Sequence, residues 1–144
     1  MATRSAIAKL GKDGIIKSVY CHSDGYLEHV GRVLDGHYRD ESKVDELLEH
    51  GDISSLNKNI GVKIDFMDYE TRTKNEQCRF YHRDRGEDLM FNEFESDIEY
   101  IEWAKESCNA EYIYMFAFGS WYVYDDNVGQ FVELEDEIAV IGIR

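Results

Sequence analysis

The strongest constraint on the fold is a series of short β-prone runs in the last third of the chain. The runs "EYIYMFAF", "WYVYDD", "QFVEL" and "EIAVIGI" are rich in β-branched and aromatic residues, and Gly-Ser, "DNVG" and "EDE" lie between them. Such runs, separated by turn sequences, are typical of an antiparallel meander. The 144 residues include no proline, so nothing opposes these strand predictions.

The N-terminal residues predict a second β element. Two β-prone runs within residues 3–21 flank "GKDG", and its glycines supply the positive φ angles that a hairpin turn requires. In the first run of the meander, Tyr112, Tyr114, Phe116 and Phe118 alternate and so share one face of the strand. We expect this aromatic face to belong to the core of the sheet.

Three segments space their apolar residues as an amphipathic helix does. They are residues 27–38, 40–50 and 90–109. Asp40 or Ser42 is expected to cap the second helix, and Gly51 lies just past its end. The third helix is expected to turn Ile98 and Ile101 toward the sheet.

The segment between the second and third helices has a weaker pattern. Residues 62–69 and 76–83 are predicted to pair as strands across the polar "ETRTKN". All the elements together predict an α+β fold with one antiparallel sheet, made of the N-terminal hairpin and the C-terminal meander. About three helices are expected to pack on one side of it, in a single globular domain over residues 1–144.

Composition excludes several classes of function. Thirty acidic against sixteen basic residues give a net charge of −14, and such a field repels nucleic acid and anionic membranes. No apolar run approaches the about 20 residues that cross a bilayer, and no secretory signal is evident. The three cysteines include no CxxC pair, which favours reduced thiols and a cytoplasmic protein.

The acidic residues are unevenly distributed. Residues 86–106 contain eight acids and one base, whereas residues 1–39 contain four acids and six bases. A solvated helix face explains such a run, but a band of carboxylates also attracts the basic surface of another protein. The predicted partner-binding residues are Glu93, Glu95, Asp97, Glu99, Glu102, Glu106, Asp125, Asp126, Glu133 and Glu135.

The segment "VYCHSDGY", residues 19–26, concentrates reactive side chains. A zinc site is not predicted, because no other Cys or His lies at the close spacing that zinc sites use. Adjacent strand residues point to opposite faces, so Cys21 and His22 cannot form a nucleophile and base. Either this segment is a strand end followed by a turn, or His22 and Asp24 belong to an acid–base site.

A second polar cluster, "FYHRDRGED", spans residues 80–88. Two arginines on either side of a carboxylate are suited to clamp a phosphate or carboxylate. The alternative is an exposed loop with weak internal ion pairs. If the two clusters converge, they form a site for a nucleotide or other phosphorylated ligand, made of His22, Asp24, His82, Arg83 and Arg85.

Several stretches resemble a family of small uncharacterised proteins from bacteriophages and prophages. They are "MATRSAIAKLGKDGIIKSVYCHSDGYLEHVGRVLDGHY", "KVDELLEHGDISSL", "YHRDRGED" and "EYIYMF". The resemblance covers about the first 56 residues and two shorter stretches, and it implies a phage setting rather than a reaction. Small acidic proteins in that setting often counter host or defence proteins, and some mimic DNA.

These observations favour a non-enzymatic protein without metal or cofactor. We expect it to engage, and to inhibit, a bacterial host or defence protein that has a basic surface, by mimicking nucleic-acid charge. The alternative is a small enzyme or binding protein for a phosphorylated ligand. A third hypothesis is a homo-oligomer built through the aromatic strand face.

Overall fold

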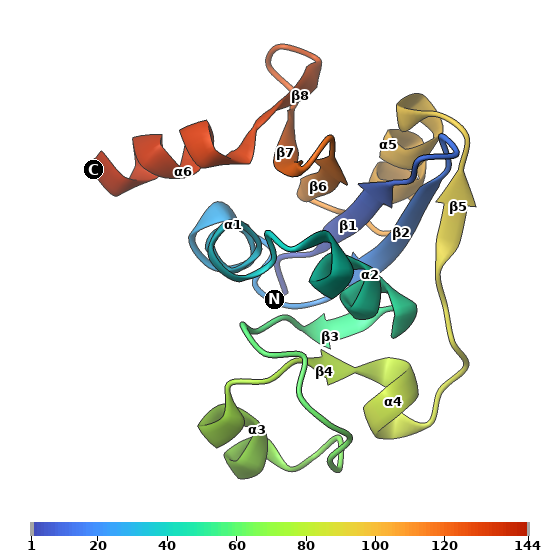
Figure 1. Cartoon of the computed structure of the whole chain (residues 1–144), viewed down its shortest axis with the longest axis vertical. Coiled ribbons are helices and arrows are strands. Elements are labelled where there is room, and N and C mark those ends of the chain that lie inside the picture. The colour runs from blue at the N-terminus through green and yellow to red at the C-terminus, as the bar shows by residue number, and fades with distance from the viewer. Residues whose placement is uncertain (1, 144) are drawn as a thin grey trace.

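The computed structural model describes residues 2–143 and shows an α+β fold built on one mixed sheet (Figure 1). The sheet has eight strands in the order β4-β3-β2-β1-β6-β7-β8, and β5 also pairs with β2. The strands are β1 (Ser5–Leu10), β2 (Ile16–Cys21), β3 (Ile53–Ser55), β4 (Arg79–Phe80), β5 (Asn92–Phe94), β6 (Tyr112–Ala117), β7 (Ser120–Asp125) and β8 (Gln130–Glu133).

Seven helical segments surround this sheet in the described part of the chain, of which the first is a single π-helical turn. They are η1 (Leu27–Gly31), α1 (Arg32–His37), α2 (Glu41–Glu49), α3 (Tyr69–Asn75), α4 (Tyr81–Arg85), α5 (Asp97–Glu106) and α6 (Leu134–Ile143). The number of helices therefore exceeds the prediction of about three.

The predicted hairpin and most of the predicted meander are present, but the sheet is not purely antiparallel. β1 pairs antiparallel with β2, and β6, β7 and β8 form an antiparallel meander. β1 also pairs in parallel with β6, and β2 with β3, which makes the sheet mixed. β1 lies between β2 and β6 and buries Ala6, Ile7 and Ala8 on its two faces, as a central strand does.

Helices cover both faces of the sheet, which corrects the prediction of a single covered face. Ile7, Val19 and Tyr114 belong to the core cluster under η1, α1 and α2. Ala6 and Ala8 point to the other face, where their small side chains leave room for α5. Figure 1 shows α2 and α5 on different sides of the β1–β2 hairpin.

The first two predicted helices are confirmed. Residues 27–37 form η1 followed by α1, and α2 begins after Asp40, whose carboxylate accepts a hydrogen bond from the Ser42 backbone N–H at 2.8 Å. Gly51 follows α2 with a φ of 74°, which glycine adopts without the steric cost of a Cβ.

The predicted strand pair between residues 62–69 and 76–83 is wrong. The polar "ETRTKN" lies within α3, because the Asp68 side chain caps this helix through the Thr71 N–H at 3.0 Å. The short β4 lies within residues 76–83, but its partner is β3. The chain between β3 and α3 forms a loop and turns instead of a strand.

Two other assignments need correction. The run "EIAVIGI" lies in α6 rather than in a strand, and the acidic residues of its first turn complement the helix dipole. The third helix begins at Asp97 instead of near residue 90, because residues 92–94 pair with β2 as β5. Its buried residues are Tyr100 and Ala104, whereas Ile98 is 66% exposed and Ile101 is half-buried.

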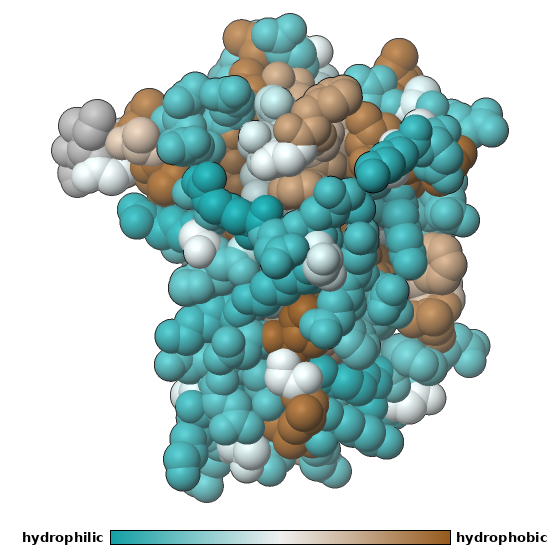
Figure 2. Space-filling view, in the orientation of Figure 1, coloured by the Kyte–Doolittle hydropathy of each residue, from teal (hydrophilic) through white to brown (hydrophobic). Residues whose placement is uncertain are grey.

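The surface is predominantly polar in the orientation of Figure 1, and apolar residues appear there in separate small groups (Figure 2). None of the helices among residues 2–143 has the length and apolarity that crossing a bilayer requires.

Candidate functional site

The strand end at residues 20–22 has the alternating geometry predicted for it. Cys21 is fully buried against the α1–α2 side of the sheet. Tyr20 and His22 lie on the other side, where the Tyr20 hydroxyl and His22 Nδ1 hydrogen-bond at 2.6 Å. The thiol and the imidazole of this segment therefore do not form a nucleophile and base.

The following turn is held by backbone contacts. Asp24 has a φ of 54°, and its carboxylate accepts a hydrogen bond from the Tyr26 hydroxyl at 3.2 Å. Gly25 donates its N–H to the Thr3 carbonyl at 2.8 Å and accepts from the buried Tyr114 hydroxyl at 2.6 Å. A Cβ on Gly25 would lie 2.7 Å from the Ser5 Cβ, so close packing against β1 accounts for this glycine.

In the "HRDR" cluster, Arg83 and Asp84 have structural roles. Arg83 donates to the carbonyl oxygens of Ile60 at 2.9 Å, Gly61 at 3.2 Å and Cys78 at 3.2 Å. Its Nε also lies 2.9 Å from an oxygen of Asp84, whose side chain is completely buried. Because these donors are already engaged, Arg83 is not free to clamp a phosphate.

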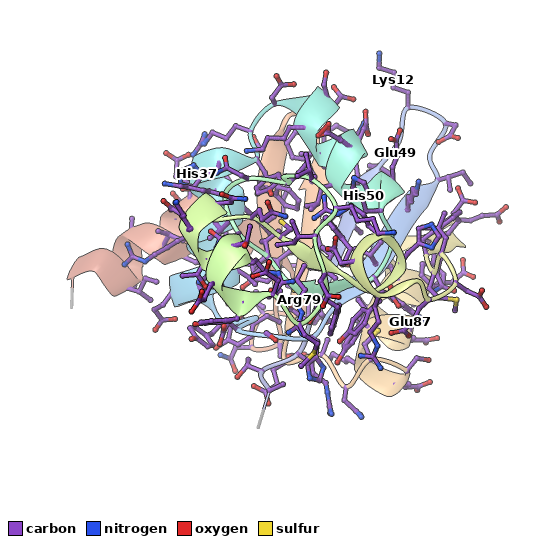
Figure 3. All side chains as sticks on the ribbon, turned by 90° about the horizontal axis from the view of Figure 1, so that it is seen from below. Lys12, His37, Glu49, His50, Arg79 and Glu87 are labelled. Atoms are coloured by element: carbon purple, nitrogen blue, oxygen red, sulfur yellow. The ribbon has the colours of Figure 1, made fainter. Side chains whose placement is uncertain are left out.

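The other members of this cluster face different partners. Arg85 pairs with Glu87 at 3.0 Å, and His82 Nδ1 donates to the Glu87 carbonyl oxygen at 2.7 Å. The Arg79 and Arg85 guanidinium groups lie 3.6 and 5.0 Å from the centre of the Phe66 ring. Figure 3 labels Arg79 and Glu87 in this part of the molecule, seen from below.

The two polar clusters make no direct polar contact with each other in the described residues. Within residues 2–143, no hydrogen bond or ion pair joins His22 or Asp24 to His82, Arg83 or Arg85. No group of three or more His, Cys, Asp or Glu side chains in this range is placed to hold a metal ion.

A cavity of about 440 Å³ is lined by residues of β2, β5 and α5 and of the loops beside them. Tyr20, Asp52, Trp103 and Cys108 are among its lining residues. The Asp52 carboxylate accepts from the Tyr20 N–H at 2.9 Å, and burial raises the pKa of Asp52. Burial and the nearby Asp52 raise the pKa of Cys108 to about 12, so this thiol is protonated at neutral pH.

We expect the thiols to react slowly in the folded protein. Burial also raises the pKa of Cys21 to about 12 and that of Cys78 above its ordinary value. At pH 8 a thiol of pKa 12 is ionised in roughly one molecule in ten thousand. Ellman's reagent should therefore label little of the native protein and all three cysteines after unfolding. Rapid native labelling that disappears in Cys108→Ser would contradict the protonated state of that thiol.

The acidic residues around α5 are exposed and carry no ion pair within the described residues. They are Glu93, Glu95, Asp97, Glu99, Glu102 and Glu106. Ser96 is the N-cap of the helix and accepts from the Glu99 N–H at 3.2 Å, while its hydroxyl donates to the Glu99 carboxylate at 3.1 Å. These two hydrogen bonds join Ser96 and Glu99 at the start of the helix, so Glu99 also has a structural role.

The C-terminal acids do not continue this surface as one band. Asp125 is half-buried, and Asp126 pairs at 2.5 Å with Lys105, the one basic residue of α5. Glu133 and Glu135 line a small cavity together with Asp35 of α1 and Arg39, on the side of the sheet opposite α5. The predicted partner-binding residues thus fall into two groups, of which the α5 group is the larger.

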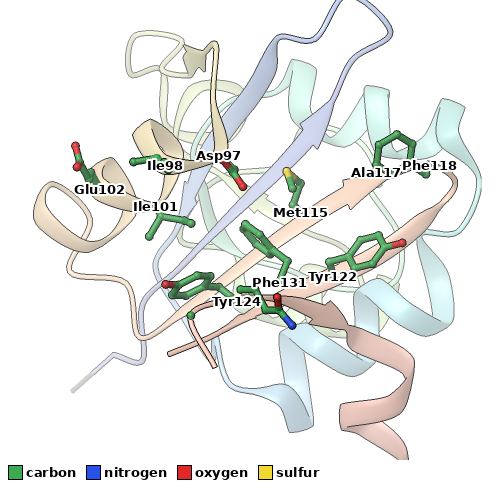
Figure 4. Close-up of a pocket in the computed structure, with 12 residues that line it drawn as sticks. Asp97, Ile98, Ile101, Glu102, Met115, Ala117, Phe118, Tyr122, Tyr124 and Phe131 are labelled. Atoms are coloured by element: carbon green, nitrogen blue, oxygen red, sulfur yellow. The ribbon is translucent and has the colours of Figure 1, made fainter. Parts of the chain in front are cut away.

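The sequence did not predict a groove of about 470 Å³ beside α5 (Figure 4). Its floor is the part of the sheet that α5 leaves uncovered, and its walls come from α5 and β8. Figure 4 shows Ile98 and Ile101 of α5 on one side of the groove and Tyr124 and Phe131 on the other, with Met115 beside Phe131. The other lining residues are Asp97, Glu102, Ala117, Phe118, Tyr122, Gly129 and Gln130.

Phe118 borders this groove and does not belong to the sheet core, which corrects the prediction from alternation. Tyr114 and Phe116 are buried and Tyr112 is half-buried, but Phe118 is 87% exposed. It occupies the two-residue turn between β6 and β7, so the strand alternation ends before it. A hairpin turn with glycine, Phe118-Gly119, was the signal that sequence reasoning missed.

Comparisons of the chain with protein-family models, with curated proteins and with solved structures find no match. The arrangement of the residues therefore carries the functional argument.

Proposed function

We propose that this protein is a non-enzymatic acidic binding protein that engages a basic surface of another protein through α5. The observation that carries the proposal is the set of exposed carboxylates on β5, on α5 and between them, which have no ion-pair partner in the described residues. The only base in α5, Lys105, is held by Asp126. The exposed charges of this helix surface are therefore predominantly negative.

Such a surface is suited to attract a partner over a distance and to orient it. Like charges that lack a counter-charge add their potentials, and complementary surfaces then associate faster and more selectively. The same field disfavours direct contact with nucleic acid, whose phosphates are also negative. A basic protein surface, including one that ordinarily binds nucleic acid, is the complementary partner.

The proposed setting rests on the sequence resemblance to phage and prophage proteins. In that setting the partner is a bacterial host or defence protein, and binding inhibits it by occupying a surface that nucleic acid would otherwise use. The grouping of carboxylates on α5 supports the charge mimicry. Glu133 and Glu135 lie apart from this group.

The triple variant Glu95→Gln, Glu99→Gln, Glu102→Gln tests the proposal. Glutamine keeps the shape of each side chain, and at position 99 its amide oxygen can still accept from the Ser96 hydroxyl, so the fold should be unchanged. We expect capture of basic proteins from a bacterial lysate to fall about tenfold at low salt. We also expect capture by the wild type to weaken steeply as salt rises, because salt screens exposed charges.

A matched control removes three charges elsewhere. Glu46, Glu49 and Glu70 are exposed on α2 and α3 and carry no ion pair among the described residues. Changing these three to glutamine alters the net charge equally but leaves α5 intact. Equal capture by wild type and the α5 variant, or equal losses in both variants, would show that α5 is not the binding surface.

A further inference from the structure

Phe118 has a backbone conformation that its side chain disfavours. It and Gly119 are the central residues of the β6–β7 turn, and their φ angles are 53° and 77°. Two positive φ angles in a two-residue hairpin loop define a type I′ turn, in which Asn-Gly, Asp-Gly and Gly-Gly are preferred. A bulky aromatic residue at positive φ is rare and strained. The stability of the turn therefore does not explain why phenylalanine occupies this position.

The exposure of the Phe118 side chain is equally unfavourable in the isolated molecule. Phe118 is 87% exposed at one end of the groove, and Ile98 on the groove wall is 66% exposed. Aromatic side chains contribute most to binding when a partner buries them in a desolvated pocket. Strain and exposure together indicate a residue retained for contact with another molecule.

The charges at the groove restrict its occupant. Asp97 and Glu102 line it, and none of the lining residues is Lys or Arg. A second copy of this chain is disfavoured, because each copy carries a net charge of −14 and would bring like charges together. An apolar side chain flanked by Lys or Arg complements both the apolar floor of the groove and the two acidic residues that line it.

We propose that the groove binds a short segment of the partner protein in which a bulky apolar residue lies next to Lys or Arg, with Phe118 as the main anchor. This inference rests on the proposed function and specifies the chemistry of the partner. The apolar residue packs on Tyr124 and Phe131, and the basic residues face Asp97 and Glu102.

The test uses a displayed library of random dodecapeptides, selected on the folded wild-type protein at low salt. We expect the enriched peptides to combine an aromatic or large aliphatic residue with Lys or Arg. Synthetic copies should bind Phe118→Asn at least about tenfold more weakly, as expected for a binding hot spot. Phe118→Asn should also melt at a higher temperature than wild type, because Asn-Gly suits the turn.

Two further variants separate the groove from general effects. Ile98→Asn removes an apolar side chain from the groove wall and should also weaken peptide binding. Tyr69→Asn removes another exposed aromatic ring, 74% exposed on α3, and should bind peptides as the wild type does. Equal binding by wild type, Phe118→Asn and Ile98→Asn would overturn the inference, as would enrichment of acidic or purely polar peptides.

The outcome also distinguishes this inference from the proposed function. If the peptides lose affinity for the Glu95, Glu99 and Glu102 variant but not for Phe118→Asn, the acidic surface stands and the groove inference fails. If they lose affinity only for Phe118→Asn, the charge-based function fails. Light scattering that shows a dimer of the wild type and a monomer of Phe118→Asn would make a second copy the occupant and overturn the inference.

Discussion

Replacing Asp84 by alanine is expected to lower the free energy of unfolding by about 3–5 kcal/mol, because it breaks a buried ion pair and leaves one partner uncompensated. The Asp84 side chain is completely buried and the Arg83 side chain is 10% exposed. The same carboxylate accepts from the N–H groups of Phe80 at 2.9 Å and Ile64 at 3.3 Å. Urea unfolding followed by circular dichroism measures the loss.

Two comparisons make this result specific. Asp84→Asn keeps one acceptor oxygen and the side-chain shape, so a smaller loss of about 1–3 kcal/mol is expected. Arg85→Ala removes a 54% exposed guanidinium whose carboxylate partner is Glu87, and an exposed pair contributes about 0–1 kcal/mol. Wild-type stability in Asp84→Ala would refute the structural role of Asp84. A large loss of stability in Arg85→Ala would show that Arg85 has this role instead.

This role explains why the "HRDR" cluster does not serve as an anion clamp. The spacing of its residues is compatible with bidentate binding of a phosphate, but Arg83 turns inward and crosslinks three backbone carbonyl groups. A sequence does not show which way an arginine in a short helix points. The loop of residues 60–64, which packs beside α4, sets the direction of the Arg83 side chain. This loop is distant from α4 in the sequence.

Local sequence signals predicted the elements whose geometry depends on near neighbours. The "GKDG" turn, the Asp40 cap and Gly51 each act within a few residues, and the corresponding hairpin and α2 are present. The segments that failed depend on distant contacts. Residues 134–143 contain enough β-branched residues to suggest a strand, but they form a helix that packs against η1 and α1, and propensity is a weak guide there.

The candidate site also combines features that the local sequence predicts with features that depend on distant contacts. The exposure of the α5 carboxylates was predictable, because a run of acids on a helix is rarely buried. The groove was not predictable, because it depends on the parallel pairing of β1 with β6, which places α5 over β1 and leaves the floor near β7 and β8 uncovered. The alternation of aromatic residues also places Phe118, at the end of the groove, in the core, although the glycine after it indicates a turn.

Replacing Tyr100 by alanine is expected to lower the free energy of unfolding by about 3–5 kcal/mol, as deletion of a buried aromatic side chain does. Tyr100 is fully buried, and its ring stacks on Phe131 with the ring centres 6.5 Å apart. Its hydroxyl donates to the Tyr114 carbonyl at 2.6 Å. This residue thus joins α5, one wall of the groove, to β6 in the floor and to β8 in the other wall.

The effect of Tyr100→Ala should therefore extend from stability to binding. Without the ring, α5 loses its main contact with the sheet, so peptide binding in the groove should fall together with hydrogen-exchange protection of the helix amides. Tyr100→Phe retains the ring and loses only the hydrogen bond, which predicts a cost of about 1 kcal/mol and wild-type peptide binding. A Tyr100→Ala protein that unfolds more easily yet binds the selected peptides with unchanged affinity would show that the docked position of α5 does not form the groove. If both properties change in Tyr100→Ala and neither changes much in Tyr100→Phe, the packing of one buried ring positions both the acidic helix and the apolar floor beside it.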